Sequence, residues 1–228
     1  MPIQLRFIFF NVGLFKNAKK GSLIIDCSTI SPMVAEDLSS QAKKESMIYV
    51  DAPVSGGVTG AAAGTLTFMV GSENEEIFER CKPFLEGMGK NFFNCKKASG
   101  GQIAKLCNNM SLAIQMIGIA ESLAIGKKLG MDEKVLAKIM SVSSARCWSV
   151  DTYNPIPDYI PNTPSGRNYE GGFACDLMLK DLGLALEAAR AAEVNAELGN
   201  LSKDIYIELS ASGLGRKDFG VIYDKLIK

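Results

Sequence analysis

The sequence predicts part of an α/β domain followed by an all-α domain, with one long helix joining the two. From Gly21 to about residue 98, short apolar runs alternate with helical stretches, which is the pattern of repeated β-α units. Residues 102–129 are nearly free of helix breakers and are apolar on most faces. Beyond this helix the patterns are helical. We therefore expect domains at 1–99 and 100–228, the second beginning with the long helix.

The first domain is expected to contain four strands and two helices. Residues 22–26 have the apolar character of a buried strand, and Pro32 suits the first turn of a helix that follows at 33–44. A Glu-rich segment with apolar residues at helical spacing predicts the second helix at 73–87. The other strands are expected at 47–50, 65–70 and 91–95. The apolar run Leu5–Phe10 is too short to span a bilayer and is expected to be a further strand.

The long helix carries polar side chains that exclude a membrane span, because such groups are costly in hydrocarbon. These are Lys105, Asn108, Asn109, Gln115 and Glu121. We expect the helix to be buried between domains or subunits. A loop rich in Pro, Gly and Asn is expected at 151–172, and further helices are expected at 132–142, 176–192, 197–212 and 216–227.

Charge and residue usage exclude several classes of function. Lys+Arg and Asp+Glu are equal at 25 each with no dominant basic run, so we expect a small-molecule ligand and neither nucleic acid nor a membrane as partner. Histidine is absent, which excludes Ser-His-Asp catalysis and removes the commonest metal ligand. The six cysteines are scattered without metal-like spacing, so no metal site is expected. We expect the first residues to be neither a signal peptide nor a transit peptide.

Three glycine-bearing segments stand out as candidate motifs: Asp51–Gly64, Gly100–Asn109 and Lys180–Ala185. Their content and order resemble the β-hydroxyacid dehydrogenases. Within that superfamily, Ser143–Ser149 and Asp151–Pro155 resemble the 3-hydroxyisobutyrate dehydrogenase family in particular. The resemblance covers about residues 13–228, and several motifs in the same order are far more specific than one motif alone.

The resemblance implies an NAD-dependent oxidoreductase whose first domain is a partial Rossmann-like domain. The reaction it implies is the oxidation of 3-hydroxyisobutyrate to methylmalonate semialdehyde in valine catabolism, so the small-molecule partner would be a 3-hydroxy acid. It also implies a mitochondrial location and a homo-oligomer formed through the helical domain. A related 3-hydroxyacid dehydrogenase or semialdehyde reductase would use the same residues and stays open as an alternative.

Lys105 and Asn109 are the strongest candidates for the site. Positions four apart share one face of a helix, so the two side chains project together. The resemblance makes Lys105 the catalytic acid/base and Asn109 a substrate-binding residue. A desolvated lysine suits proton transfer, because burial lowers its pKa toward neutrality. The competing interpretation of Lys105 alone is a surface lysine extending from a helix terminus. One departure from the family pattern is Ser99, which stands where G-x-G usually has its first glycine.

Ser55, Gly56 and Gly57 follow the strand that ends near Asp51. Glycines at the carboxyl end of a strand leave backbone N–H groups open to a carboxylate, and Ser55 adds a hydroxyl. The resemblance implies that these three residues bind the substrate. The alternative is a tight turn without a ligand.

Thr29 and Lys180 are the candidates for contact with the cofactor. Thr29 follows the strand at 22–26, at the edge where open α/β sheets bind ligands. The resemblance places both residues beside the nicotinamide cofactor. A helix cap before Pro32 is the alternative for Thr29, and an ordinary surface lysine is the alternative for Lys180.

The sequence contains no strand followed by the G-x-G-x-x-G turn that normally binds the pyrophosphate of a dinucleotide. Gly213-Leu-Gly215 lacks the third glycine and follows a helix, so it is interpreted as a helix stop. The family has its fingerprint at the N-terminus, and we expect this chain to begin after it. Either the chain is a fragment or alternative product of a longer gene, or its cofactor affinity is severely reduced. The rival function is that of a catalytically impaired isoform or fragment that acts only as a binding or assembly module.

Overall fold

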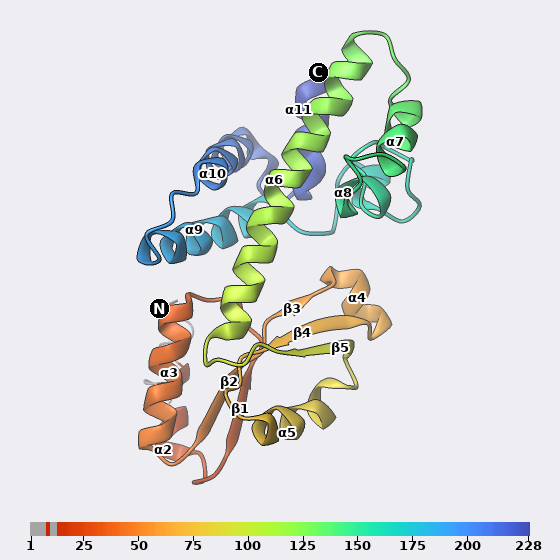
Figure 1. The fold of residues 1–228 in the computed structure, drawn as a ribbon. Coiled ribbons are helices and arrows are strands. Elements are labelled where there is room, and N and C mark those ends of the chain that lie inside the picture. Colours follow the sequence, from red (N-terminus) through yellow and green to blue (C-terminus); the bar gives the residue numbers. More distant parts are fainter. Residues whose placement is uncertain (1–7, 10–12) are drawn as a thin grey trace. The chain divides into compact units, whose positions relative to one another are not determined.

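The structure is a computed structural model that describes residues 8–9 and 13–228. The chain divides into two compact units. The first runs to Cys107 and includes residues 190–192, and the second comprises residues 108–189 and 193–228. One uninterrupted helix, α6 (Gly100–Lys128), begins in the first unit and continues into the second (Figure 1). The predicted long helix is therefore confirmed, and it begins at the two glycines themselves.

The first unit is the predicted α/β region, and all four strands expected at 22–26, 47–50, 65–70 and 91–95 are present. Both expected helices are present as well, and α3 has its proline at the start as predicted. In chain order the elements are α2 (Leu14–Asn17), β1 (Leu23–Asp26), α3 (Pro32–Lys44), β2 (Ile48–Asp51), β3 (Val54–Ser55), α4 (Gly57–Ala63), β4 (Leu66–Val70), α5 (Glu75–Leu85) and β5 (Gly89–Asn94).

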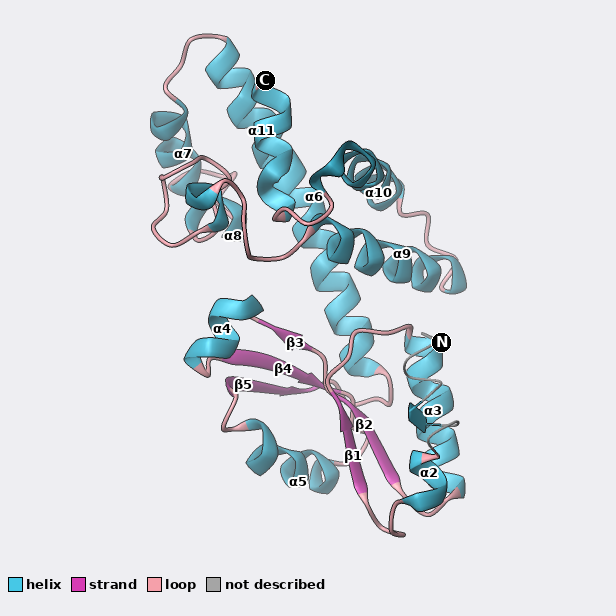
Figure 2. Cartoon of the chain, turned by 180° about the vertical axis from the view of Figure 1, so that it is seen from behind, coloured by secondary structure: helices cyan, strands magenta, loops and turns pink. Residues whose placement is uncertain are grey.

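The strands of the first unit form two parallel pairs with one short antiparallel addition (Figure 2). β1 pairs with β2 so that Asp26 lies opposite Asp51, and β4 pairs with β5. β3 lies antiparallel to β4, and an isolated bridge joins Asp51 to Gly71. The parallel pairs place the carboxyl ends of β1 and β2 side by side, which is where α/β sheets present ligands.

Two apolar clusters hold this unit together. One packs α3 against β2 through Ala35, Leu38 and Ala42, whose spacing puts them on one face of the helix. Phe9 belongs to it and contacts Phe15 and Tyr49 with ring centroids 5.0 and 5.9 Å away. The other packs α5 against β4, with Phe68, Val70, Phe78, Cys81 and Leu85 at its centre.

The strand expected at residues 5–10 lies outside the described residues except for Ile8 and Phe9, neither of which is in a strand. Two short helices, α2 and α4, were not predicted from the sequence. The segment of α4, Gly-Val-Thr-Gly-Ala-Ala-Ala, contains two glycines that argue against a helix, but its three alanines are strong helix formers.

The second unit is helical, as predicted. The helices expected near 132–142, 176–192 and 197–212 are present, and the last one ends at Gly213 with φ of 81°, which confirms the helix stop. After α6 the elements are α7 (Glu133–Ser141), α8 (Trp148–Asp151), η2 (Pro164–Arg167), α9 (Cys175–Ala191), α10 (Glu197–Leu209), η3 (Ser210–Leu214), η4 (Phe219–Val221) and α11 (Ile222–Ile227).

The segment expected to be a loop, 151–172, is more structured than predicted. It contains the 3₁₀ turn η2, and Thr163, Ser165 and Tyr169 within it are buried. Its polar groups are paired internally: the Tyr169 hydroxyl donates to the carbonyl of Pro155 at 2.8 Å, and Thr163 and Ser165 hydrogen-bond each other at 2.9 Å. Composition alone predicted an irregular loop, because these partners are not visible in a local pattern.

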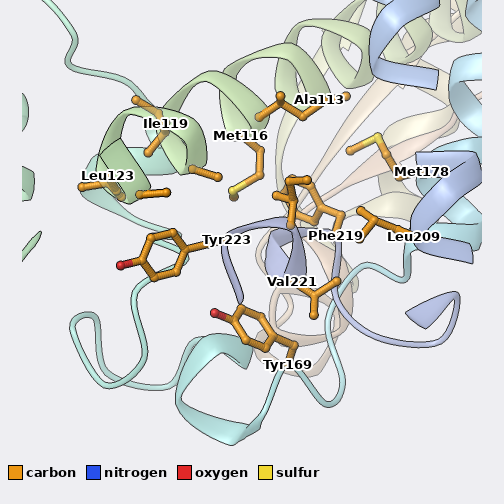
Figure 3. Close-up of a cluster of buried hydrophobic side chains, with 14 of the residues drawn as sticks. Ala113, Met116, Ile119, Leu123, Tyr169, Met178, Leu209, Phe219, Val221 and Tyr223 are labelled. Atoms are coloured by element: carbon orange, nitrogen blue, oxygen red, sulfur yellow. The ribbon is translucent and has the colours of Figure 1, made fainter. Parts of the chain in front are cut away.

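The core of the second unit forms around α6 (Figure 3). Ala113, Met116 and Leu123 of α6 are fully buried and lie toward Phe219 and Tyr223. Within the described part of the chain, α6 has the length and apolarity that a membrane span requires, and its apolar residues are those of a core helix. Burial in this core accounts for part of its apolar surface, while Ile103 and Ile125 are exposed.

Candidate active site

The helix that carries Lys105 is anchored at its start by a buried carboxylate at the end of β2. Asp51 is 1% exposed, and its Oδ1 and Oδ2 accept hydrogen bonds from the backbone N–H groups of Ser99 and Gln102, both at 2.9 Å. The first N–H groups of a helix have no partner within it, and negative charge is favourable there. Burial raises the pKa of Asp51, while its backbone hydrogen bonds oppose that shift. Asp51 therefore fixes the first turn of α6.

Gly101 is required at this junction because the backbone of β4 lies against it. A Cβ at this position would lie 2.1 Å from the Met69 carbonyl oxygen and 2.8 Å from Asp51 Oδ2. Ser99, which stands where the resemblance expects a glycine, has a left-handed φ of 67°. Its hydroxyl donates to Glu36 at 3.0 Å. The position thus keeps the backbone conformation that favours glycine.

Lys105 and Asn109 lie one turn apart in α6, and both are buried, at 9% and 3% exposure. The prediction that they share a helix face is confirmed by the continuity of α6 across both positions. Asn108 is exposed and its amide donates to Asn109 Oδ1 at 3.2 Å. Both side chains are thus held out of water, so Lys105 does not extend into solvent as a surface lysine would.

A buried carboxylate joins Asn109 to Lys180 in the second unit. The Asn109 amide donates to Asp181 Oδ2 at 2.6 Å, and Lys180 Nζ forms an ion pair with Asp181 Oδ1 at 2.9 Å. Asp181 is 3% exposed, whereas the side chain of Lys180 is about half exposed. The structure therefore links Asn109 and Lys180 through Asp181. The family resemblance implied substrate binding for Asn109 and cofactor contact for Lys180, and Asp181 was not among the predicted site residues.

Thr29 lies in the turn between β1 and α3, and this turn is bonded to the first turn of α6. The Gln102 amide donates from Nε2 to the Ser28 carbonyl at 2.8 Å and accepts at Oε1 from the Ile30 N–H at 3.0 Å. Just before the turn, Asp26 accepts hydrogen bonds from the Ser28 N–H and the Tyr49 hydroxyl, both at 2.9 Å. Thr29 is half-buried.

The sequence predicted that Ser55, Gly56 and Gly57 come directly after β2. In the structure the short strand β3 (Val54–Ser55) lies between β2 and the two glycines. Ser55 ends β3, where it pairs with Thr67 of β4, and Gly57 begins α4. Gly56 has a φ of 133°, and a Cβ there would lie 3.0 Å from Leu66. The two glycines therefore provide a sharp change of direction between strand and helix, and their exposed backbone lies at the N-terminus of α4.

The predicted site residues are distributed over both units. Thr29, Ser55–Gly57 and Lys105 belong to the first, and Asn109 and Lys180 to the second. Sequence reasoning missed Gln102 and Asp181, although both lie in glycine-bearing motifs, Gln102 three residues before Lys105 and Asp181 next to Lys180. Their buried positions could not be inferred, because the hydrogen bonds of the Gln102 amide and the bond from Asn109 to Asp181 join residues 72 or more apart in the chain.

Comparison with known proteins places this arrangement in a family. Residues 99–226 match the family model described as NAD-binding of NADP-dependent 3-hydroxyisobutyrate dehydrogenase. Residues 4–97 match the NAD binding domain of 6-phosphogluconate dehydrogenase. The chain belongs to the 3-hydroxyisobutyrate dehydrogenase family. The family resemblance and the α/β-then-helical fold class predicted from the sequence are thereby confirmed.

Individual relatives agree with this assignment. The chain is 48% identical over 94% of its length to mitochondrial 3-hydroxyisobutyrate dehydrogenase of Homo sapiens, and it spans 63% of that protein. It is 45% identical over 92% of its length to an NAD-dependent L-serine dehydrogenase of Pseudomonas aeruginosa, of which it spans 70%. A solved structure of Mycobacterium tuberculosis 3-hydroxyisobutyrate dehydrogenase with L-serine matches 99% of the chain and 76% of its own, with 39% identity and a TM-score of 0.92.

NAD is the cofactor of this family, and the residues present fit part of a dinucleotide site. At the carboxyl ends of β1 and β2, beside Thr29, the Ser31 hydroxyl is buried and has no hydrogen-bond partner among the described residues. A polar group left unpaired at a ligand-binding edge suits a polar ligand. The glycine fingerprint for the pyrophosphate is not in the sequence, so the fit is limited to this edge of the first unit.

Proposed function

We propose that this chain takes part in the NAD-dependent oxidation of a small 3-hydroxy acid, with Lys105 as the acid/base. The observation that carries the proposal is the pair of buried polar side chains, Lys105 and Asn109, one turn apart on a helix that Asp51 anchors. Membership of a dehydrogenase family supports the reaction class. The chain spans about 63% of the length of several curated relatives, so the activity of those proteins is extended to it as a proposal.

The chemistry needs a group that moves a proton at the alcohol oxygen. Oxidation of an alcohol removes a hydride from carbon and a proton from oxygen, and NAD when bound accepts the hydride. Lys105, in its neutral form, takes the hydroxyl proton, and it returns the proton in the reverse direction. A buried lysine is suited to this step because its charged form is less stable away from water.

The remaining site residues bind and orient. The Asn109 amide has two N–H groups, and Asp181 accepts one of them, which leaves the other for the substrate. Ser55, Gly56 and Gly57 hold the carboxylate through the hydroxyl and the first N–H groups of α4. Thr29 and Lys180 contact the cofactor.

We assign 3-hydroxyisobutyrate as substrate and methylmalonate semialdehyde as product, a step of valine catabolism. The names of the mammalian relatives support this substrate and a mitochondrial location. L-Serine is the second candidate, supported by the Pseudomonas aeruginosa relative and by the Mycobacterium tuberculosis structure. Both compounds are 3-hydroxy acids with a primary alcohol, and they differ at C2, where one has a methyl group and the other an ammonium. The ratio of their kcat/KM values decides between them.

We also propose a homo-oligomer formed through the helical unit. Exposed apolar side chains on this unit support it, among them Ile125, Leu129, Val142, Leu198 and Leu201. Light scattering of the purified chain measures its oligomeric state. A monomer at working concentrations would contradict the proposed homo-oligomer.

Substitution of Lys105 tests the proposed reaction. Loss of an acid/base lowers kcat by about 10² or more, so Lys105→Ala should do so while leaving NADH binding in place. Lys128→Ala, which removes an exposed lysine at the far end of the same helix, is the matched control and should retain full turnover. Turnover of Lys105→Ala within a few-fold of the unsubstituted chain would sink the assignment.

Titration with NADH separates this proposal from a binding or assembly module. Binding enhances the fluorescence of the reduced nicotinamide, so the signal reports occupancy directly. The proposal requires saturable binding by the unsubstituted chain. A chain that oligomerises without binding NADH would instead support the assembly role.

A further inference from the structure

One side chain joins the turn that carries Thr29 to the helix that carries Lys105. Gln102 is fully buried, and its amide bonds the backbone on both sides of Thr29: the carbonyl of Ser28 and the N–H of Ile30. Its own backbone N–H donates to Asp51. Gln102 therefore connects the carboxyl ends of β1 and β2 to the first turn of α6.

The contacts use the amide in a way that other side chains cannot reproduce. Only a primary amide offers an acceptor and a donor at the same end of a side chain of this length without charge. Ile30 is 1% exposed, so its N–H has no access to water if the Gln102 oxygen is removed. A buried backbone group without a partner is costly, and the turn would have to move to regain one.

The position of Gln102 on α6 gives these bonds a functional consequence. Residues three apart lie on neighbouring positions of one helix face, so Gln102 and Lys105 share a face of the first turns. A rigid helix segment of one turn thus links the Gln102 amide, which holds the turn around Thr29, to the proposed proton-transfer residue. Displacements of about 1 Å between reacting groups cost large factors in rate.

We propose that Gln102 is a positioning residue that sets the place of Thr29, and with it the nicotinamide cofactor, relative to Lys105. The inference rests on the proposed function, because it takes Thr29 as a cofactor contact and Lys105 as the acid/base. Gln102 itself touches neither substrate nor cofactor. It acts through the backbone of Ser28 and Ile30.

Two substitutions of Gln102 and one control test this inference in the full chain. Gln102→Met keeps the size of the side chain and removes both hydrogen bonds. Gln102→Glu keeps an acceptor for Ile30 and removes the donor to Ser28, and it provides a second variant should the first fold poorly. Gln115→Met makes the same chemical change at an exposed position of α6 and is the matched control.

The first measurement is hydrogen exchange at the Ile30 amide, which needs neither cofactor nor substrate. Exchange at Ile30 should rise about tenfold or more in Gln102→Met, because its acceptor is gone. The Ile48 amide, which donates to Ser22 at the opposite end of β1, is the internal reference and should not change. Unchanged exchange at Ile30 overturns the inference.

The second measurement distinguishes positioning from a general effect on stability. The dissociation constant for NADH and the KM for NAD should rise about tenfold in Gln102→Met, with the KM for the hydroxy acid within twofold of the control. Gln102→Glu should also raise the NADH dissociation constant relative to Gln115→Met, because it loses the donor to Ser28 and places a carboxyl at a buried position. An unchanged NADH dissociation constant in a variant with faster Ile30 exchange overturns the inference. An unsubstituted chain that fails to bind NADH contradicts the proposed function instead, and Ile30 exchange still decides whether Gln102 holds the turn.

Discussion

At the scale of single residues, the site is organised by carboxylates and amides that do not take part in the proposed chemistry. Asp181 holds Asn109 at 2.6 Å and pairs with Lys180 at 2.9 Å, while Asp51 holds the backbone at the start of α6. A buried charge is stable only when its surroundings pair it, and here each partner is itself a candidate site residue or is close to one. The hydrogen bond to the buried Asp181 carboxylate thus fixes the orientation of the Asn109 amide.

Asp181→Asn tests this orientation. The substitution preserves volume but exchanges a charged acceptor for a neutral amide, so the Asn109 amide loses a charge-assisted hydrogen bond of about 1.5–3 kcal/mol. We expect kcat/KM for the hydroxy acid to fall about tenfold or more. Asp204→Asn, at an exposed position of α10, is the control and should change kcat/KM by less than twofold. Equal kcat/KM for both variants would show that Asp181 does not position Asn109.

At the scale of elements, two glycines of α6 have opposite surroundings. Gly101 lies against the Met69 carbonyl, where a Cβ would be 2.1 Å away, whereas Gly118 has open space at the same atom. Both are helical, so the intrinsic preference for alanine is the same at each position. Only the surroundings differ, so the same substitution at Gly101 and Gly118 reports how closely β4 packs on the start of α6.

Alanine at these two glycines should have effects of opposite sign on the free energy of unfolding. Gly118→Ala should raise it by about 0.5–1 kcal/mol through helix propensity and loss of freedom in the unfolded chain. Gly101→Ala should lower it by about 3 kcal/mol or more, because backbone atoms cannot move aside as a side chain would. Chemical denaturation of the two variants measures both changes. A Gly101→Ala chain as stable as the Gly118→Ala chain would contradict the close packing.

The elements also show which parts of the fold could be predicted from sequence. The strands at 22–26 and 65–70 and the helix α6 follow from apolar periodicity, which is a local property, and the structure confirms them. The short β3 and α4 were missed, because two pairing residues and a glycine-rich helix leave too weak a pattern. The family motifs predict Lys105 and Asn109 as site residues, and this stays a prediction. The side-chain hydrogen bonds of Gln102 and the bond from Asn109 to Asp181 join residues 72 or more apart, which no local pattern contains.

At the scale of the whole molecule, another buried carboxylate, Asp218, ties the C-terminal segment to the loop at 151–172 of the helical unit. Asp218 is 2% exposed and accepts hydrogen bonds from the Tyr153 hydroxyl at 2.8 Å and from the Phe173 and Gly220 N–H groups, both at 2.9 Å. Burial raises the pKa of Asp218 to about 6, against the opposing effect of these donors. The folded unit therefore binds a proton more tightly at this site than the unfolded chain does.

This shift predicts how stability changes between pH 5 and pH 7. A carboxyl whose pKa is raised by folding stabilises the fold most fully below its unfolded pKa of 3.8, and this contribution is lost as pH rises through about 6. The helical unit should therefore be more stable at pH 5 than at pH 7 by about 1 kcal/mol. Glu36 and Glu75, whose pKa values are lowered, lose their contributions below this window and should not mask the effect.

The fluorescence of Trp148 can measure this difference in unfolding free energy between pH 5 and pH 7. It is the single tryptophan of the chain and lies in the helical unit. Its ring stacks on Tyr153 with 4.6 Å between centroids, and the Tyr153 hydroxyl donates to Asp218. Denaturation followed by its fluorescence should give the greater unfolding free energy at pH 5, and Asp218→Asn should remove most of the difference whatever its effect on absolute stability. A pH dependence that survives Asp218→Asn would assign it to other groups. Because Asp218 connects the C-terminal turn to the loop at 151–172, loss of the pH dependence in Asp218→Asn would show that the bonds between these two segments carry it.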